Sequence, residues 1–296
     1  MKFTSNDGSR RQFFFMFGRS TGDIEVNGRY VEGSRIVDNR TDGYCVSWAY
    51  DGAYRKITDD LGMIEVNDNM VACSNEDVQA EFYGSFPEYR LEISDCEKNI
   101  CSFTIDEPAE DRYTTELMEN FKGLFGYRVA NLYFDFKGML FDKELSGKCY
   151  VQKVIVVGPM LPWKWSRIIF SNGSVLTYYT SNIGVIGLDY EIRNFMSFYD
   201  ATTKKMHNFK KAMVHEHPSG LGDNRWVITT EDHRVFVVTK GYCSETFNFT
   251  KNFNFNYVEN LVDVVDLRIE VDDRLITLEE TGEGLGMVED TSGFVM

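Results

Sequence analysis

Short stretches rich in aromatic and β-branched residues recur along the whole chain, and glycine, asparagine, aspartate or serine separates one from the next. This spacing is typical of antiparallel strands joined by short turns. The predicted strands of the first half are residues 44–50, 62–66, 70–74, 78–83, 89–94 and 100–105. Those of the second half are residues 128–137, 148–157, 166–170, 175–180, 193–199, 225–230, 235–239, 264–271 and 274–279. We therefore expect an all-β protein with little helix.

The length of 296 residues fits either two β modules or one large sandwich or barrel. Residues 113–124 are the one segment with helical character, because their apolar side chains recur at intervals of four and three. This segment follows Pro108, which favours a linker or bridging helix there. We accordingly predict an N-terminal β module over residues 1–120 and a C-terminal β-barrel over residues 121–296.

The formal net charge of −15 restricts the partners that the protein can have. A surface this acidic repels phosphate backbones and anionic lipid head groups, so we expect no nucleic-acid partner. Much of the excess negative charge falls between Glu88 and Glu119. We interpret this run as a solvated face, since charge runs usually serve solubility, with an acidic partner-binding patch as the alternative.

The amino-terminal sequence and the cysteines indicate in which cellular compartment the protein is expected. The sequence begins without the basic and then apolar pattern of a secretory signal, and residues 13–17 are far too short an apolar run to span a bilayer. We expect a cytoplasmic protein with no stable membrane insertion. Six widely spaced cysteines include no Cys-x-x-Cys pair, which disfavours a zinc ribbon. We expect free thiols, with a pairing of Cys96 and Cys101 across a hairpin as the alternative.

The most specific pattern begins in the middle of the chain. It consists of the segments GKCYVQKV (147–154), GP (158–159), PWKW (162–165) and FSNGSVLTYY (170–179), with the glycine-rich GEGLGMVE (282–289) near the end. These segments resemble the lipocalin-like superfamily of hydroxyneurosporene synthase (carotenoid 1,2-hydratase), the AttH proteins and tocopherol cyclase. The resemblance covers roughly residues 125 to 296. It implies two lipocalin-like antiparallel β-barrel or sandwich modules in tandem.

The same segments supply the candidate ligand-binding residues. Strand alternation puts Trp163 and Trp165 on one face of their strand, and Tyr150 and Gln152 on one face of theirs. Tyr178 lies on the next predicted strand. In a barrel with a cavity, such aromatics would offer apolar contact area while a few polar tips orient the ligand. The other interpretation is that the two indoles fill a core between sheets.

The resemblance also implies chemistry, because the family's enzymes protonate an alkene or stabilise a carbocation with a carboxylic acid beside aromatic rings. Such an acid must be kept protonated by burial. Glu283 and Glu289 are the candidate catalytic acids, each flanked by glycines or apolar residues. The alternative is that both are exposed, as acids in a glycine-rich strand usually are.

A metal site is the third hypothesis. His215 and His217 would share one strand face, and His233 lies in a neighbouring segment, so a three-histidine zinc site is conceivable. Pro218 and the residues after it place the pair at a loop edge, and we predict that no metal is required. No helix pattern follows the glycine repeat at 282–286, so we expect no phosphate-binding loop and no cofactor.

The sequence thus predicts a barrel protein that binds an apolar, isoprenoid-like small molecule. It leaves three functions open: hydration, isomerisation or cyclisation of that molecule, non-catalytic carriage or scaffolding on the same fold, and metal-dependent catalysis with a His-x-His site. A buried acid inside the cavity would favour an enzyme, and an all-apolar cavity would favour a carrier. The sequence does not define the ligand or the oligomeric state.

Overall fold

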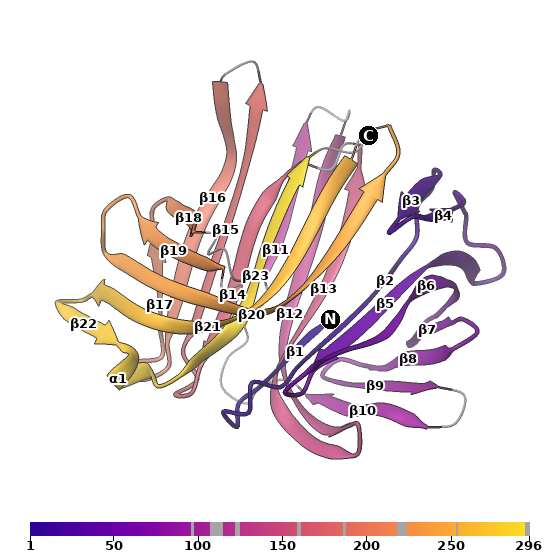
Figure 1. Ribbon diagram of the computed structural model, residues 1–296, viewed down its shortest axis with the longest axis horizontal. Helices are drawn as coiled ribbons and strands as arrows, with labels where there is room; N and C mark the ends of the chain where they lie inside the picture. Colours follow the sequence, from indigo (N-terminus) through magenta and orange to yellow (C-terminus); the bar gives the residue numbers. More distant parts are fainter. Residues whose placement is uncertain are drawn as a thin grey trace. The chain divides into compact units, whose positions relative to one another are not determined.

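The chain folds into β-strands throughout, as the sequence predicts. The computed structural model describes residues 1–95, 98–106, 115–121, 125–158, 161–185, 188–217, 224–252 and 254–293. In these ranges the one helix is α1 (Leu278–Thr281). The chain divides into two compact units, Met1–Pro159 and Met160–Met296, rather than near residue 120. Each unit is an antiparallel β module, so two such modules follow one another in the chain (Figure 1).

The first unit is built around a closed ring of strands. Within the described residues the ring has ten strands, because β10 pairs with β12 and β13 pairs with β1. In spatial order these strands are β1 (Lys2–Ser5), β2 (Gln12–Gly18), β5 (Arg40–Tyr50), β6 (Tyr54–Asn67), β7 (Met70–Ser74), β8 (Val78–Ser85), β9 (Glu88–Asp95), β10 (Asn99–Asp106), β12 (Phe125–Leu140) and β13 (Lys143–Val157). The short strands β3 (Ile24–Val26) and β4 (Arg29–Val31) pair with each other as a hairpin. We call the ten-stranded ring the first barrel.

Strands β12 and β13 explain why the division between the units lies later than predicted. Both belong to the first barrel, where they supply the strands that complete the ring. They were expected to open the second module, because their sequence pattern is continuous with that of the strands that follow. Strand alternation carries no information on which sheet a strand joins, so the pairing of β13 with β1 could not be read from the pattern.

The prediction of a helix over residues 113–124 is wrong for the part of that segment that the structure describes. Residues Thr115–Phe121 form strand β11, which pairs with β12 from Thr115 opposite Asn131 to Phe121 opposite Phe125. Strand β10 pairs with β12 only over residues 135–140, so the edge at residues 125–131 is open to β11, and backbone pairing there overrides a weak helical pattern. The remaining residues of the predicted helix lie outside the described ranges.

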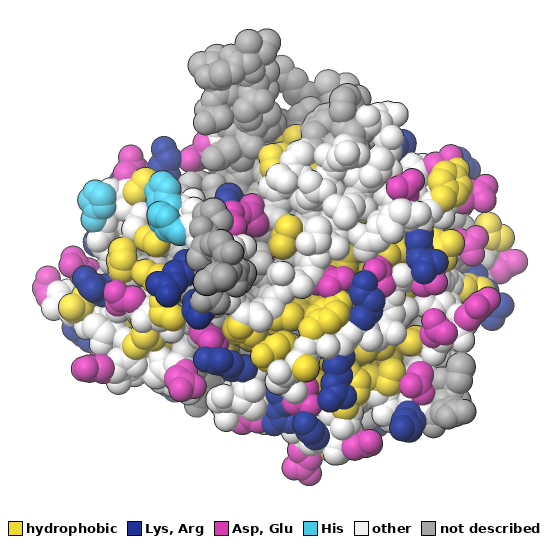
Figure 2. Space-filling model, in the orientation of Figure 1, with side chains coloured by type: hydrophobic (Ala, Val, Ile, Leu, Met, Phe, Trp, Pro, Cys, Tyr) yellow, Lys and Arg dark blue, Asp and Glu magenta, His cyan; other side chains and the backbone are white. Residues whose placement is uncertain are grey.

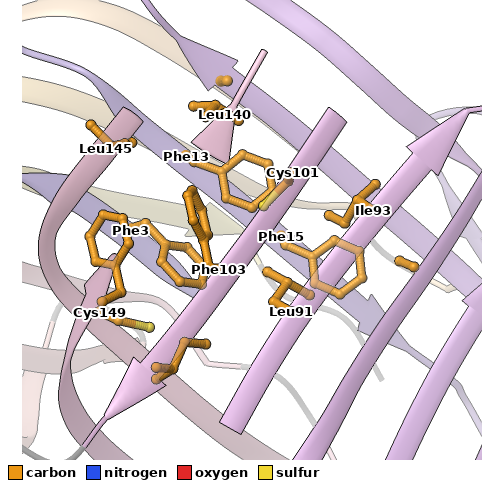
Figure 3. Close-up of a cluster of buried hydrophobic side chains, with 14 of the residues drawn as sticks. Phe3, Phe13, Phe15, Leu91, Ile93, Cys101, Phe103, Leu140, Leu145 and Cys149 are labelled. Carbon is orange, nitrogen blue, oxygen red and sulfur yellow. The ribbon is translucent and has the colours of Figure 1, made fainter. Parts of the chain in front are cut away.

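Phenylalanine rings fill the interior of the first barrel. Phe3 lies 5.0 Å from Phe103 and 5.1 Å from Phe136, measured between ring centroids, and Phe103 lies 4.8 Å from Phe136. Figure 3 shows the rings of Phe3, Phe13 and Phe103 gathered in this cluster. These distances fall in the range of favourable aromatic packing. The first barrel is therefore held together by a dense aromatic core.

The second unit is one curled antiparallel sheet. Its strands are β14 (Trp163–Phe170), β15 (Val175–Val185), β16 (Leu188–Asp200), β17 (Lys205–Phe209), β18 (Ala212–His217), β19 (Arg225–Thr230), β20 (Val235–Thr250), β21 (Asn254–Val271), β22 (Arg274–Thr277) and β23 (Gly284–Gly293). The order across the sheet is β17, β16, β15, β14, β23, β21, β20, β19 and β18, with β22 paired to β21 (Figure 1). We call this unit the second barrel.

Asn194 on β16, the neighbour of the end strand β17, bonds to β18 at the other end of the second barrel's sheet. Its side-chain Nδ2 donates to the carbonyl oxygen of Ala212 on β18 at 2.9 Å, and its Oδ1 accepts from the Ala212 N–H at 2.7 Å. The amide thus takes the place of a neighbouring backbone residue. One core cluster accordingly includes side chains from both ends, with Met196 on β16 and Ala212 on β18.

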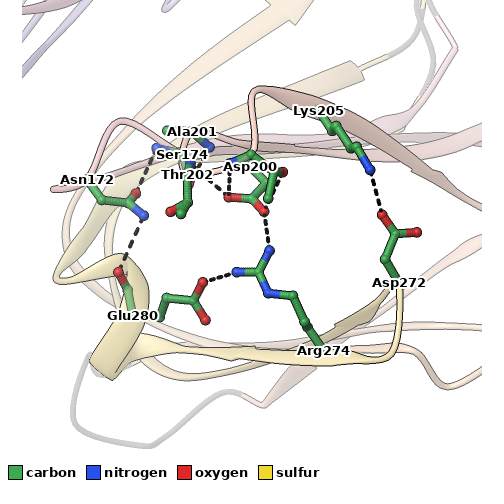
Figure 4. Close-up of polar contacts among 10 residues, drawn as sticks. Asn172, Ser174, Asp200, Ala201, Thr202, Lys205, Asp272, Arg274 and Glu280 are labelled. Atoms are coloured by element: carbon green, nitrogen blue, oxygen red, sulfur yellow. Dashed lines mark hydrogen bonds and ion pairs between the residues drawn. The ribbon is translucent and has the colours of Figure 1, made fainter.

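Asp200, at the end of β16, ties a turn to the distant strand β22. Its carboxylate accepts hydrogen bonds from Thr203 Oγ1 at 2.8 Å and from the Thr202 N–H at 2.9 Å. Arg274 donates to Asp200 at 3.1 Å and also contacts Glu280 (Figure 4). Burial alone raises the pKa of Asp200, but these hydrogen bonds outweigh it and hold the pKa below its usual value.

The cysteines that the structure describes are free thiols, as expected. They are Cys45, Cys73, Cys101, Cys149 and Cys243. Cys96 lies outside the described residues, so its pairing with Cys101 stays an untested alternative, whereas Cys101 itself is free. No described helix is long and apolar enough to cross a membrane.

Acidic and basic side chains are interspersed on the face of the molecule shown in Figure 2, where apolar patches lie between them. In the acidic run of the sequence, Glu88 pairs with Arg90 at 3.6 Å and Glu92 accepts a hydrogen bond from Tyr83 at 3.1 Å. These contacts are exposed and contribute little free energy. They agree with a solvated face for this part of the run.

Candidate functional site

The structure places two of the predicted ligand-binding residues in the first unit. Tyr150 and Gln152 share one face of β13, as alternation predicts, opposite the core residue Cys149. Tyr150 Oη donates to Asn131 Oδ1 at 2.9 Å, and Gln152 Nε2 donates to Tyr150 Oη at 2.5 Å. The Tyr150 ring stacks on Tyr133. Their polar groups therefore bond one another on the outer face of the first barrel.

The other three predicted residues lie in the second barrel but on two faces of its sheet. Tyr178 belongs to the core cluster inside the barrel, and its cross-strand partner is Ser166. Alternation along β14 then puts Trp163 and Trp165 on the outer face, away from Ser166. Within the second barrel, Trp163 and Trp165 therefore do not share an interior with Tyr178, while Tyr150 and Gln152 belong to the first unit. Strand alternation correctly predicted which residues share a face of one strand, but it could not show which face of the sheet forms the interior.

The two candidate acids have different surroundings. Glu283 is exposed in the short segment between α1 and β23. Glu289 is buried on β23, directly opposite Glu259 on β21, and accepts a hydrogen bond from Trp163 Nε1 at 2.6 Å. Tyr257 donates to Glu259 beside it. Burial and the nearby Glu259 and Glu289 carboxylates raise the pKa of Tyr257 well above its usual value, so this hydroxyl stays protonated.

Glu289 thus matches one expectation drawn from the sequence resemblance, a buried acid beside aromatic rings. It points to the outer face of the sheet, because its cross-strand partner Trp165 does so. The barrel interior lies on the other face, where Val288 contributes to the core. Neither predicted acid therefore faces the interior of the second barrel.

Three fully buried polar atoms inside the second barrel have no hydrogen-bond partner. Among the described residues with no such partner are Tyr178 Oη, Trp226 Nε1 and Thr239 Oγ1, and these side chains are at most 1% exposed. Trp226 and Thr239 are cross-strand partners on β19 and β20, and Tyr178 shares a core cluster with Trp226. Buried polar groups are nearly always bonded, so three in one interior are unusual.

Two other inward polar groups of this barrel are satisfied, whereas His207 Nε2 on β17, opposite the core residue Phe198, is a further buried atom without a hydrogen-bond partner. Ser166 Oγ donates to the carbonyl oxygen of Met287 at 2.8 Å, and Asn260 Nδ2 donates to that of Val288 at 3.2 Å. The first barrel has no such unpartnered atom among its described core residues, since Trp48 lies on the outer face opposite Phe14. The second barrel is therefore the better candidate for a ligand site.

Burial raises the pKa of Tyr178 most, and the charges of Asp290 and Glu289 raise it further. The hydroxyl accordingly remains protonated at any physiological pH and can donate a hydrogen bond. Trp226 lies against Gly241, where even a Cβ would come within 3.2 Å of the ring. Gly241 thus leaves the space that the indole occupies.

A small charged cluster lies on the same face of the sheet as the unpartnered polar groups of Tyr178, Trp226 and Thr239. Lys164 Nζ forms an ion pair with Asp290 at 2.9 Å, and both side chains are partly buried. Glu216 on β18 is more exposed and hydrogen-bonds Asp290. Burial, followed by the charge of Asp290, raises the pKa of Glu216. Since Glu216 is opposite Trp226 in the sheet, we treat this exposed end as the mouth of the second barrel.

The histidines do not form a metal site among the described residues, where no group of three metal-ligating side chains occurs. His215 and His217 share the exposed outer face of β18. His233 lies in the turn between β19 and β20 with a φ of 56°. Pro218 lies outside the described ranges.

Sequence reasoning missed Trp226, Thr239, Lys164, Asp290 and Glu216. Alternation in residues 225–230 and 235–239 would have put Trp226 and Thr239 among inward residues. No pattern marks which inward polar group lacks a partner, because that depends on strands far apart in the chain.

No protein-family profile and no curated protein matches the sequence. Among solved structures, the chain is similar to the crystal structure of a candidate AttH from Nitrosomonas europaea, with a TM-score of 0.47 and 11% sequence identity. The likeness covers 98% of this chain and 89% of that one. Because this TM-score is low, the fold of the chain rests on its own strand pairings.

Proposed function

We propose that the protein binds a largely apolar small molecule inside the second barrel. The observation that carries this proposal is the set of three buried, unpartnered polar atoms on Tyr178, Trp226 and Thr239. Leaving such a group without a hydrogen bond costs about 1–3 kcal/mol each. A ligand with a matching polar group would recover that free energy on binding.

The apolar character of the ligand follows from the side chains around these atoms. The same cluster contains Ile168, Phe198, Val237 and Val262, each fully buried. An interior of this kind favours apolar surface, while a few polar groups fix orientation. An isoprenoid-like molecule, as the sequence resemblance implies, has this composition.

Binding or carriage is better supported than catalysis by the predicted acids. Glu283 is exposed and Glu289 points away from the interior, so neither reaches a molecule held there. The observation that favours hydration, isomerisation or cyclisation is instead Glu216 at the mouth, whose raised pKa suits a general acid. Turnover of an isoprenoid by the wild-type protein but not by the Glu216→Gln variant would support this second function.

A dye titration tests the proposed function. Nile red, a neutral hydrophobic dye, should bind the full chain and brighten, and a bound apolar ligand should displace it. Trp226→Phe should weaken ligand binding by roughly 1–3 kcal/mol if the indole contacts the ligand. Trp165→Ala, which alters the outer face that the sequence favoured, is the comparison. A loss with Trp165→Ala alone, or no dye binding at all, would refute a site inside the barrel.

A further inference from the structure

The three unpartnered groups define what kind of polar group could bind them. The indole Nε1–H of Trp226 can only donate a hydrogen bond. The hydroxyls of Tyr178 and Thr239 can both donate, and the raised pKa of Tyr178 keeps its proton in place. The one role that serves all three is therefore an acceptor on the ligand.

An ammonium group is a poor fit to this site. It carries only donors and has no lone pair to accept from Trp226. Its charge would also have to enter an interior whose core cluster is apolar and includes Ile228 and Val237. The acids near the mouth therefore do not make the interior a site for cations.

A carboxylate is disfavoured by the charges near the mouth. Lys164 is the cation there, and its charge is already matched by Asp290 at 2.9 Å. Glu216 adds a second acid beside the pair. An anionic head group would meet two carboxyl groups and one committed ammonium, and would lose its hydration in the apolar interior.

We propose that the ligand of the second barrel is a neutral, largely apolar molecule whose carbonyl oxygen accepts hydrogen bonds from Trp226 Nε1 and from the hydroxyl of Tyr178 or Thr239. A carbonyl oxygen has two lone pairs and no hydrogen, so it accepts two such bonds and adds no unpaired donor. Ketones, aldehydes and esters of apolar chains share this chemistry. The inference rests on the proposed function, since it names the ligand class of the same site.

Displacement of Nile red by molecules of equal chain length tests the ligand class. The set is a linear alkane, its methyl ketone, its secondary alcohol, its carboxylate and its primary amine. Two hydrogen bonds gained in a buried site predict that the ketone binds at least about fivefold tighter than the alkane. The carboxylate and the amine should bind weaker than the ketone. A ketone that binds no tighter than the alkane, the alcohol or either charged molecule would overturn the carbonyl assignment.

Variants separate this inference from the proposed function. Tyr178→Phe with Thr239→Val, or Trp226→Phe, should bring the affinity for the ketone down to that for the alkane and leave alkane binding within about twofold. Tyr179→Phe, which removes a hydroxyl from the other face of the same strand, should leave both affinities unchanged. If no member of the set displaces the dye, the proposed function fails. If all members bind but the variants keep the ketone preference, only the carbonyl assignment fails.

Discussion

Thr239 and Trp226 lie directly opposite each other on β20 and β19, and neither the hydroxyl of one nor the indole N–H of the other has a hydrogen-bond partner among the described residues. Both side chains are buried in the interior of the second barrel. An interior that served packing alone would gain stability from Val and Phe at these positions. The polar groups thus lower the stability of the ligand-free protein, which is typical of a binding site.

Replacement of the unpartnered hydroxyls should stabilise the ligand-free protein. Tyr178→Phe and Thr239→Val each remove a buried group that has no bond to lose, so the free energy of unfolding should rise by about 1 kcal/mol. Urea denaturation followed by circular dichroism measures this change. Ser166→Ala is the matched control, because it removes a hydroxyl that bonds Met287 and should be destabilising. A loss of stability in Tyr178→Phe as large as in Ser166→Ala would contradict the account.

The strand pattern of the sequence predicts much of this fold. Residues 70–74 and 225–230 form strands with the predicted bounds. Alternation also pairs Tyr150 with Gln152 and Trp163 with Trp165 correctly. These features are local, since they depend on spacing within a strand and on turn residues.

The interior of each barrel depends on pairings that spacing does not encode. Both Trp165 and Tyr178 lie in aromatic strands, so the sequence pattern suits an inward position for either residue. In the structure Trp165 pairs with Tyr179 and therefore lies on the opposite face from Tyr178. A shift of register by one residue would exchange these faces. The sequence therefore identified the aromatic strands but not the face that forms the site.

Loss of the Asn194 amide should weaken the contact between β16 and β18. Asn194→Ala removes the bonds to both backbone groups of Ala212 and should lower the free energy of unfolding by about 1–3 kcal/mol. Asn194→Asp keeps only an acceptor and should be intermediate. Hydrogen exchange at the Ala212 N–H should accelerate in Asn194→Ala. Equal stability in Asn194→Ala and in Asn208→Ala, an exposed control on β17, would show that this contact is unimportant.

Asp200 should make the second barrel sensitive to acid. Its folded-state pKa lies below the ordinary value of 3.8, so its stabilisation is present above about pH 4 and is lost as the pH falls through the lower folded value. Asp200→Asn should cost about 1–3 kcal/mol at neutral pH and reduce the decline of stability below pH 4.

Asp272 provides the control for Asp200, because its ion pair with Lys205 is exposed (Figure 4). Asp272→Asn should change the free energy of unfolding by less than about 0.5 kcal/mol. Unfolding monitored between pH 7 and pH 2 distinguishes the two variants. Parallel pH profiles for the wild type and Asp200→Asn would contradict the assigned role.

Cys243 and Cys101 should react slowly in the native protein. Cys243 is half-buried, and burial followed by the charge of Glu245 raises its pKa to about 11. Its alkylation by iodoacetamide should therefore increase as the pH rises towards 11, since the thiolate is the nucleophile. Cys101 is fully buried and its pKa is raised further by burial, so it should label only on unfolding. Fast labelling near pH 8 that Cys243→Ala abolishes would contradict this prediction.

The indole N–H resonances of the tryptophans, read by NMR during a ligand titration, test the central claim most directly. Trp226→Phe assigns the Trp226 signal, and Trp163, whose N–H already bonds Glu289 on the outer face, serves as the internal control. With the methyl ketone, the Trp226 signal should move downfield as the N–H donates to the carbonyl oxygen, while that of Trp163 should stay. A shift of the Trp163 signal alone, or of neither, would contradict a ligand site inside the second barrel.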